Sequence, residues 1–205
     1  MFKKYRRSAT DLGLLLLRVN IGGLLAGHGA QKLFGAFGGG GVQGTSKMME
    51  KMNLKPGEPW ALLAGASEFG SGVLLALGLL SPLGPIASVG PMITAWAEMH
   101  SGKPIWNTKG GGELPLLYLA AAAALGLTGP GRYSADEALG IEVPNAVVGL
   151  TALGVAAGLA MTLLTAEPVK KPARPEPAQQ HAPDATQSTQ PETHEQATHA
   201  HEVGG

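Results

Sequence analysis

Seven polar side chains lie within or beside long apolar runs of the sequence. Three of them, His28, Glu68 and Glu98, can take up and release protons and are the candidate catalytic residues. The other four can hydrogen-bond to a ligand or carry a charge toward it, and these candidate binding residues are Gln31, Lys32, His100 and Glu113. An ionisable group inside a bilayer costs roughly 3 kcal/mol or more and by default marks a functional site. The pattern therefore indicates proton transfer or ligand binding in surroundings of low polarity.

Several of these residues also have a purely structural explanation. The Lys32 side chain can extend to the membrane interface, and Glu113 can stabilise the N-terminus of a helix. Glu98 and His100 lie close enough to the predicted boundary to be hydrated. The sequence leaves these alternatives open.

Glu68 is the deepest of the acidic candidates, in the first half of its apolar segment. A structural ion pair of Glu68 with Arg18, His28 or Lys32 is the alternative to a chemical role. Arg18 lies nearer the other end of the first apolar segment, so we predict that it is structural and belongs to an ion pair.

The elements that must position these side chains are apolar helices. A bilayer core requires about 20 mostly apolar residues in helical form. Five segments approach that length: 12–33, 60–80, 83–99, 113–128 and 145–165. Continuous hydrophobicity on this scale is rare in a soluble helical bundle. The sequence predicts an all-α membrane protein, with a four-helix transmembrane bundle and an additional transmembrane helix over 145–165.

Consecutive spans run in opposite directions, and this places the polar candidates together. His28, Gln31 and Lys32 close the first span, and Glu68 lies in the first half of the second. Glu98 and His100 close the third span, while Glu113 opens the fourth. We therefore expect all seven candidates on the membrane side opposite the N-terminus, and Arg18 nearer the other side.

Small residues and one proline predict how the spans pack. Gly65 and Gly72 flank Glu68 on one helix face, and Gly23 and Gly27 form a Gly-x-x-x-Gly pair in the first span. Small residues of this kind let membrane helices approach closely. Pro91 lacks an amide donor, so it frees the carbonyl of residue 87 and predicts a kink in the third span.

Composition excludes several classes of function. Basic and acidic residues number fifteen each, so the net charge is zero and no nucleic-acid partner is expected. The absence of cysteine excludes disulfides, thiolate catalysis and iron–sulfur clusters. No metal site is predicted, because the histidines of the tail, which are His181, His194, His199 and His201, fit a solvated segment better.

The rest of the chain is predicted to be peripheral. Residues 1–11 form a basic N-terminal segment, and 45–54 a short helix along the membrane surface. Residues 167–205 are rich in Pro, Gln, Thr and Ala and are predicted to be disordered. The basic N-terminus favours a cytoplasmic start, although the lysines of the later loops argue for the opposite orientation.

The sequence resembles one family of small bacterial membrane proteins. LLRVNIGGLLAGHGAQKLFG, GASEFGSGVLLALGLLSPLG and GGELPLLYLAAAAALGLTGPGRYSADE are similar to the DoxX family over residues 12–137. The resemblance implies a four-helix bundle in the bacterial inner membrane, with the polar candidates at positions where the family also has polar residues. The helix over 145–165 and the tail depart from the minimal family pattern.

Two functions from different classes remain open at this point. The resemblance implies a membrane subunit linked to quinone chemistry, in which His28 donates to a quinone carbonyl, Glu68 or Glu98 exchanges protons and Lys32 favours the reduced anion. Such a subunit needs a redox partner protein, because the chain has no cysteine set and no c-type haem motif. The alternative is a non-enzymatic assembly, scaffold or small-solute or proton permeation protein, possible also as a homo-oligomer in the lipid bilayer. Whether the chain is an enzyme is left open.

Overall fold

The computed structural model describes residues 2–165, and this part of the chain contains helices and no strand. The expected disordered tail over 167–205, with its histidines, lies outside the described residues. The long helices are α1 (Phe2–Phe34), α3 (Gly57–Leu77), α4 (Leu83–Ala95), α5 (Glu113–Thr128) and α7 (Asn145–Thr165). Two shorter helices, α2 (Gly41–Lys51) and α6 (Ala135–Leu139), lie in the connections. The prediction of an all-α membrane protein is confirmed.

Three helices are long and apolar enough to cross a membrane: Ser8–Phe34 within α1, Gly57–Leu77 and Asn145–Thr165. The fourth predicted span, α5, has 16 residues, and at 1.5 Å per residue it is about 24 Å long. A hydrocarbon core of about 30 Å would need local thinning or help from the flanking residues there. That α4 and α5 cross the membrane stays a prediction.

The first helix begins earlier than the sequence suggested. Residues 1–11 were predicted as a separate basic segment, but α1 is helical from Phe2. Lysine and arginine are good helix formers, and neither Gly nor Pro interrupts residues 2–12. The basic residues therefore lie on an extension of the same helix that carries His28 and Lys32.

The third predicted span changes its helix type near its end. The α-helix α4 ends at Ala95 and continues as a π-helical turn over Trp96–His100, so residues 83–100 remain helical. The ring of Trp96 packs against Gly112, where a Cβ atom would lie 2.6 Å from it. Such π-turns are rare and occur frequently at functional sites, and this one carries Glu98.

The close contact between α1 and α3 depends on small residues. A Cβ atom at Gly72 would lie 2.3 Å from the backbone nitrogen of Ala26, and one at Gly22 would lie 2.4 Å from that of Ala76. The prediction that Gly65 and Gly72 serve close packing is confirmed, since a Cβ atom at Gly65 would meet Leu33 at 2.7 Å.

The predicted role of Gly23 and Gly27 is wrong. A Cβ atom at either position meets nothing within 4 Å, so this pair faces away from the other helices. The contact stripe of α1 is instead Gly22, Ala26 and Gly29, one position away along the same helix. A shift of one residue turns a helix by 100°, and this moves Gly23 and Gly27 off the face that meets α3.

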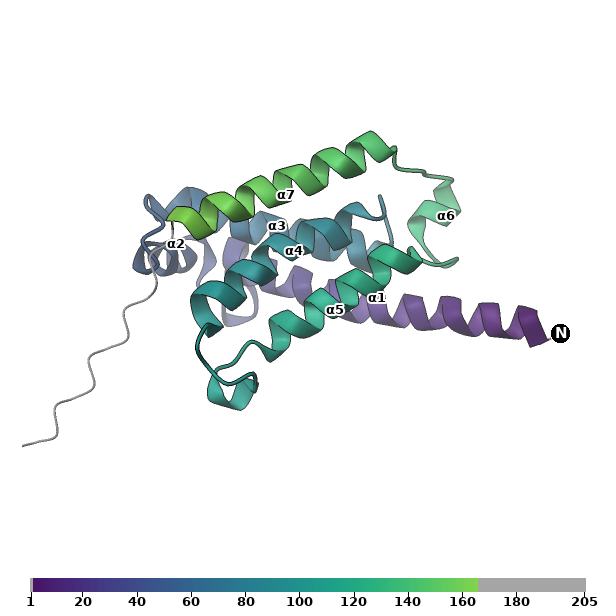
Figure 1. Ribbon diagram of the computed structural model, residues 1–205, viewed down its shortest axis with the longest axis horizontal. Coiled ribbons are helices and arrows are strands. Elements are labelled where there is room, and N and C mark those ends of the chain that lie inside the picture. The colour runs from purple at the N-terminus through teal and green to yellow at the C-terminus, as the bar shows by residue number, and fades with distance from the viewer. Residues whose placement is uncertain (1, 166–205) are drawn as a thin grey trace, which may run out of the picture. The chain divides into compact units, whose positions relative to one another are not determined.

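The helices follow one another through space in a defined order. Helix α1 lies along α3, α3 lies along α4, and α4 contacts both α5 and α7 (Figure 1). Leu25, Leu75, Met92, Tyr118 and Leu125 form the main buried cluster of this arrangement.

Helix α2 packs on protein rather than only on a membrane surface. Met49, Met52, Leu54 and Ala61 form a second buried cluster, which joins α2 to the first turns of α3. The helix begins at Gly41, earlier than the predicted residue 45. Its methionines therefore border the interior, while Lys47 and Lys51 are exposed.

Candidate functional site

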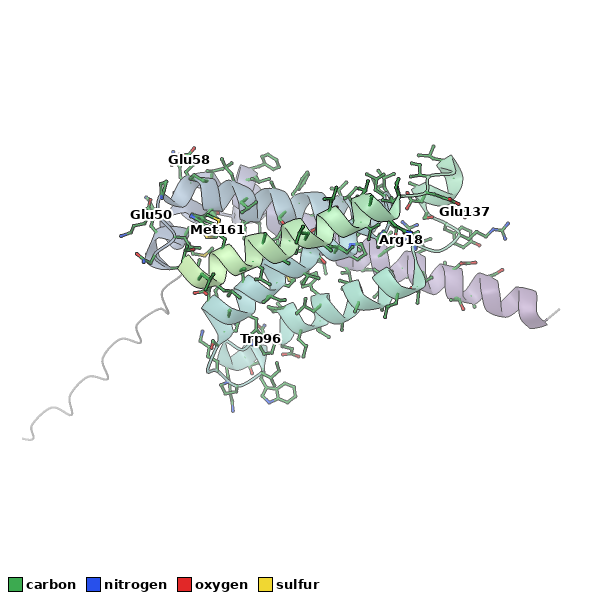
Figure 2. The ribbon with its side chains drawn as sticks, turned by 45° about the horizontal axis from the view of Figure 1, so that its top comes forward. Arg18, Glu50, Glu58, Trp96, Glu137 and Met161 are labelled. Carbon is green, nitrogen blue, oxygen red and sulfur yellow. The ribbon has the colours of Figure 1, made fainter. Side chains whose placement is uncertain are left out.

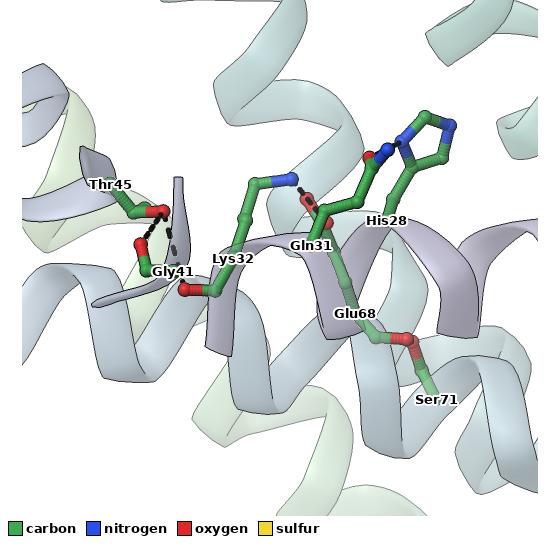
Figure 3. A network of polar contacts seen from close by, with 7 residues as sticks. All are labelled: His28, Gln31, Lys32, Gly41, Thr45, Glu68 and Ser71. Atoms are coloured by element: carbon green, nitrogen blue, oxygen red, sulfur yellow. Dashed lines mark hydrogen bonds and ion pairs between the residues drawn. The ribbon is translucent and has the colours of Figure 1, made fainter. Parts of the chain in front are cut away.

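The deepest predicted acid forms an ion pair at the contact between α1 and α3. The Lys32 ammonium and the Glu68 carboxylate are 2.5 Å apart, Nζ to Oε2 (Figure 3). The Glu68 side chain is 6% exposed and that of Lys32 is 24% exposed. A charge this well buried needs a partner, and the sequence brings one because both residues lie toward the same end of neighbouring antiparallel helices.

The end of α1 that carries Lys32 is held in place by α2. The Thr45 hydroxyl donates to the backbone carbonyl of Lys32 at 3.3 Å and to that of Gly41 at 2.8 Å (Figure 3). Thr45 is itself buried. The last carbonyls of a helix have no partner within that helix, and Thr45 satisfies one of them. Helix α2 therefore helps to hold Lys32 in position for the ion pair.

A cavity of about 260 Å³ opens beside this ion pair, and we call it the Glu68 pocket. Its walls come from α2, α3, α4 with the π-turn, and α7, and Lys32 of α1 also lines it. Most of the lining is apolar, including Trp60, four methionines and the glycines of α7. The polar lining residues are Lys32, Ser67, Glu68, Thr94, Glu98 and Thr162.

The α4 wall of the Glu68 pocket contains a carbonyl that the helix itself does not satisfy. Pro91 has no amide N–H to bond the carbonyl of Ala87, as the sequence predicted. The hydroxyl of Ser67 on α3 donates to that carbonyl at 3.3 Å. All three residues line the pocket, so a polar contact lies in its wall next to Glu68.

Two predicted site residues, His28 and Gln31, do not line the Glu68 pocket. The His28 Nδ1 and the Gln31 Oε1 lie 3.2 Å apart, and His28 is exposed (Figure 3). Its ring contacts the ring of Tyr118 on α5 edge to face, with centroids 6.3 Å apart. His28 thus faces α5, whereas Lys32, one turn later, faces Glu68.

The remaining two predicted ligands, His100 and Glu113, hold the loop between α4 and α5. His100 donates from Nδ1 to the carbonyl of Gly110 at 2.8 Å, and the Glu113 carboxylate accepts from the amide of Asn107 at 2.9 Å. Neither side chain lines the Glu68 pocket. Of the seven candidates, the pocket therefore collects Lys32, Glu68 and Glu98.

Arg18 lies at the opposite end of the helices from Trp96 and Glu58, close to Glu137 (Figure 2). It is 2% exposed and donates to the backbone carbonyls of Ala76, at 2.7 Å, and of Tyr133. The predicted ion pair is therefore replaced by hydrogen bonds to carbonyls. The physical reason is distance along α1, since Glu68 lies beside the other end of that helix.

The end of the molecule around Arg18 is a structural junction. The Asp136 carboxylate accepts from the amides of Leu80 and Ser81, at 2.7 and 2.8 Å, and so caps the turn between α3 and α4. Gly78 ends α3 with a φ of 62°, and a Cβ atom there would lie 2.7 Å from the Arg18 guanidinium. The GPGRYS sequence, residues 129–134, leads into this junction and therefore serves packing there.

Sequence reasoning missed Ser67, Thr94 and the entire α7 wall. Residues 87, 91, 94 and 98 are spaced as one face of a helix, so Thr94 could have been found one turn before Glu98. No such signal exists for α7, because its residues 145–165 are apolar or small all round. Within the described residues, no group of three His, Asp or Glu side chains could hold a metal ion.

Comparison with known proteins gave a match for one segment of the chain, and this segment contains the ion pair of Lys32 and Glu68. Searches of the curated proteins and of the solved structures gave no significant match. The family model described as DoxX matches residues 13–101, from α1 to just beyond the π-turn. The matched segment includes Lys32, Glu68 and Glu98, and ends before α5 and α7. Residues 13–101 of this membrane protein therefore form a DoxX domain.

Proposed function

We propose that the protein is a membrane subunit of a quinone-linked oxidoreductase system, located in the bacterial inner membrane. It binds a quinone headgroup in the Glu68 pocket and acts with a partner protein. The observation that supports this most is an ion pair and an unpaired hydroxyl in the wall of an otherwise apolar pocket. Ligand pockets are mostly apolar with a few placed polar groups.

Two hydrogen-bond donors are available to the two carbonyl oxygens of such a headgroup. The Lys32 ammonium has three N–H donors, and the contact with Glu68 uses one of them. The Thr94 hydroxyl, on a different wall, has no hydrogen-bond partner among the described residues and lines the pocket. The apolar residues would cover the ring and the first part of the isoprenoid chain.

Glu68 would exchange protons with the quinone headgroup. When bound, a quinone supplies two-electron, two-proton redox chemistry. The Glu68 carboxylate lies beside Lys32, at the place where a headgroup oxygen would accept the ammonium hydrogen bond, and it can give or take a proton there. The electrons would come from the partner protein, since the sequence has no cysteine for a cluster and no c-type haem motif.

One observation favours a non-enzymatic role as the second candidate. Lys32 and Glu68 satisfy each other across 2.5 Å at the α1–α3 contact. An ion pair of this kind can hold two helices together with no ligand present. In that case the protein would serve assembly or permeation, and the pocket would contain lipid only.

The experiment that separates the two candidates is extraction of the purified protein followed by mass spectrometry. The informative variant is Thr94→Val, which removes a donor from the pocket while keeping the side-chain shape. Its control is Thr151→Val on the exposed part of α7, where the hydroxyl bonds only its own helix. We expect quinone to copurify with the wild type and the control, and to be reduced severalfold in Thr94→Val. Absence of quinone from the wild type would overturn the proposal.

A further inference from the structure

We propose that the end of the Glu68 pocket that carries Glu98 and Trp60 binds a small organic cation with an apolar group, which pairs with Glu98. This inference goes beyond quinone binding, because it uses Glu98, which has no part in the proposed quinone site. It starts from the charges that line the cavity, which are Lys32, Glu68 and Glu98. The first two pair with each other, so Glu98 is the carboxylate of the lining that has no counter-charge among the described residues.

Glu98 has neither a hydrogen-bond donor nor an ion-pair partner among the described residues. The other polar side chains of the lining, apart from Thr94, form hydrogen bonds within the protein, and these residues are Lys32, Ser67, Glu68 and Thr162. A carboxylate among apolar groups is costly unless a cation or a proton compensates it. The α7 wall contributes no ionisable residue, and the lining residues of α2 are methionines. Any cation that pairs with Glu98 must therefore come from outside the described helices.

The wall around Glu98 fits an organic cation better than a metal ion. Hard divalent cations take six or more oxygen ligands, whereas the described residues offer no cluster of three acidic or histidine side chains. The lining includes Trp60, Met52 and Met99. An indole ring attracts a cation over its face, and methionine adapts its shape to varied apolar groups.

Trp60 and Glu98 belong to the same end of the pocket. Helices α3 and α4 are joined by the short turn after Gly78 and run antiparallel, so the start of α3 lies level with the π-turn that follows α4. Thr162, near the end of α7, lines the same end. The aromatic face, the carboxylate and the apolar wall are therefore available to one ligand.

The π-turn that carries Glu98 is held by two contacts at its last two residues, Met99 and His100. His100 donates to the Gly110 carbonyl at 2.8 Å, and the Lys103 ammonium donates to the Met99 carbonyl at 2.8 Å. Glu98 lies between these anchors and the Pro91 segment. A preorganised carboxylate loses little freedom when a cation binds. The cavity, at about 260 Å³, is slightly below the usual range of ligand pockets, about 300 Å³ upward, so a ligand with a single ring fits best.

The test uses benzyltrimethylammonium, a permanent cation with one ring, and neopentylbenzene, its uncharged analogue of the same shape. The full chain is placed in nanodiscs of phosphatidylcholine, which carries no net charge, and binding is measured by calorimetry. We expect saturable binding of the cation at one site per chain, at least tenfold weaker binding in Glu98→Gln, and no comparable binding of the uncharged analogue. Glu58→Gln is the matched control, because Glu58 is exposed at the start of α3 and does not line the pocket.

A second variant fills the pocket without touching any charge. Gly158 lines the α7 wall, and a Cβ atom there meets nothing within 4 Å. Gly158→Leu should abolish cation binding, whereas Gly149→Leu, which is equally open but outside the lining, should preserve it. Independently of any variant, the cation but not its analogue should raise the melting temperature of the wild type.

The proposal is overturned if the wild type binds no cation, if Glu98→Gln binds it as tightly as the wild type, or if the uncharged analogue binds equally well. Failure of quinone binding is a separate result. Thr94→Val should lose quinone and keep the cation, and Glu98→Gln should keep quinone and lose the cation. Loss of both ligands in Glu98→Gln, with an unchanged melting temperature, would contradict separate roles for Thr94 and Glu98.

Discussion

The hydroxyl of Ser67 donates to the carbonyl of Ala87 across the contact between α3 and α4, at 3.3 Å. Within a regular helix this carbonyl would accept from the amide of residue 91, but residue 91 is proline. A neighbouring helix therefore supplies the hydrogen bond that α4 cannot make. In a bilayer an unsatisfied carbonyl costs several kcal/mol, so this contact ties the two helices together where they border the Glu68 pocket.

Ser67→Ala should lower stability modestly, by about 0.6 kcal/mol, the average for a hydrogen bond between membrane helices. The same substitution in a Pro91→Ala background should have almost no effect, because the restored amide of residue 91 then bonds the Ala87 carbonyl. Unfolding in mixed micelles, followed by circular dichroism, gives both values. Equal effects in the two backgrounds would show that the Ser67 hydroxyl does not serve this carbonyl.

Glu68→Gln should reduce stability by about 3 kcal/mol, because it leaves the half-buried Lys32 ammonium without a counter-charge. Adding Lys32→Gln should recover part of that loss, since the two amides can hydrogen-bond to each other. Arg18→Gln should give no recovery, because Arg18 contacts carbonyls at the other end of the helices. The same unfolding measurement decides, and rescue by Arg18→Gln would contradict the observed pairing.

Gly29→Ala and Gly27→Ala form a matched pair on α1. A Cβ atom at Gly29 would lie 2.2 Å from the backbone nitrogen of Phe69, and one at Gly27 meets nothing within 4 Å. We expect Gly29→Ala to cost about 1–3 kcal/mol through overpacking, and Gly27→Ala to be neutral or to stabilise the helix by up to about 1 kcal/mol. Comparable melting temperatures for the two variants would mean that α1 meets α3 through another face.

Asp136→Ala should cost about 1–3 kcal/mol, because the amides of Leu80 and Ser81 lose their acceptor. Glu137→Ala is the control, since that side chain is exposed in the same short helix. Thermal unfolding of the two variants tests the assignment. A larger effect of Glu137→Ala would show that the cap of the α3–α4 turn lies elsewhere.

Single cysteines can test the predicted topology, because the natural chain contains none. Gln43 and Glu142 are both exposed, before α3 and before α7. With a cytoplasmic N-terminus and four crossings through α5, a cysteine at position 43 should react with an impermeant maleimide in intact cells. A cysteine at position 142 should react only after lysis. Labelling of both in intact cells would show that one of α3, α4 and α5 does not cross.

The sequence predicted the helices well where the bilayer determines them. The bounds of α5 and α7 match the apolar segments 113–128 and 145–165, because a chain in lipid must satisfy its backbone within the helix. The face of α1 that meets α3 was harder to predict, since glycines occupy two neighbouring faces of α1 and only the contacts with Phe69, Gly72 and Ala76 of α3 distinguish them.

The candidate site was predictable only in part. Lys32 and Glu68 could be placed together because spans alternate in direction, and the structure selects this pair from the alternatives that were open. Spacing alone could not show that His28 contacts α5 and not Glu68. His28 and Lys32 lie on the same face of α1, and this face borders both α3 and α5. The contribution of α7 had no signal at all, since a helix that is apolar all round does not indicate which side meets protein.

The Asp136 carboxylate connects the segment that matches the DoxX family model to a part of the chain beyond that segment. The segment that matches the DoxX family model ends at residue 101, yet the turn between α3 and α4 within it is capped by a residue that follows α5. During synthesis, α3 and α4 are therefore made before the residue that caps the turn between them. The segment that matches the family model is therefore shorter than the segment that must be synthesised before the α3–α4 turn has all of its hydrogen bonds.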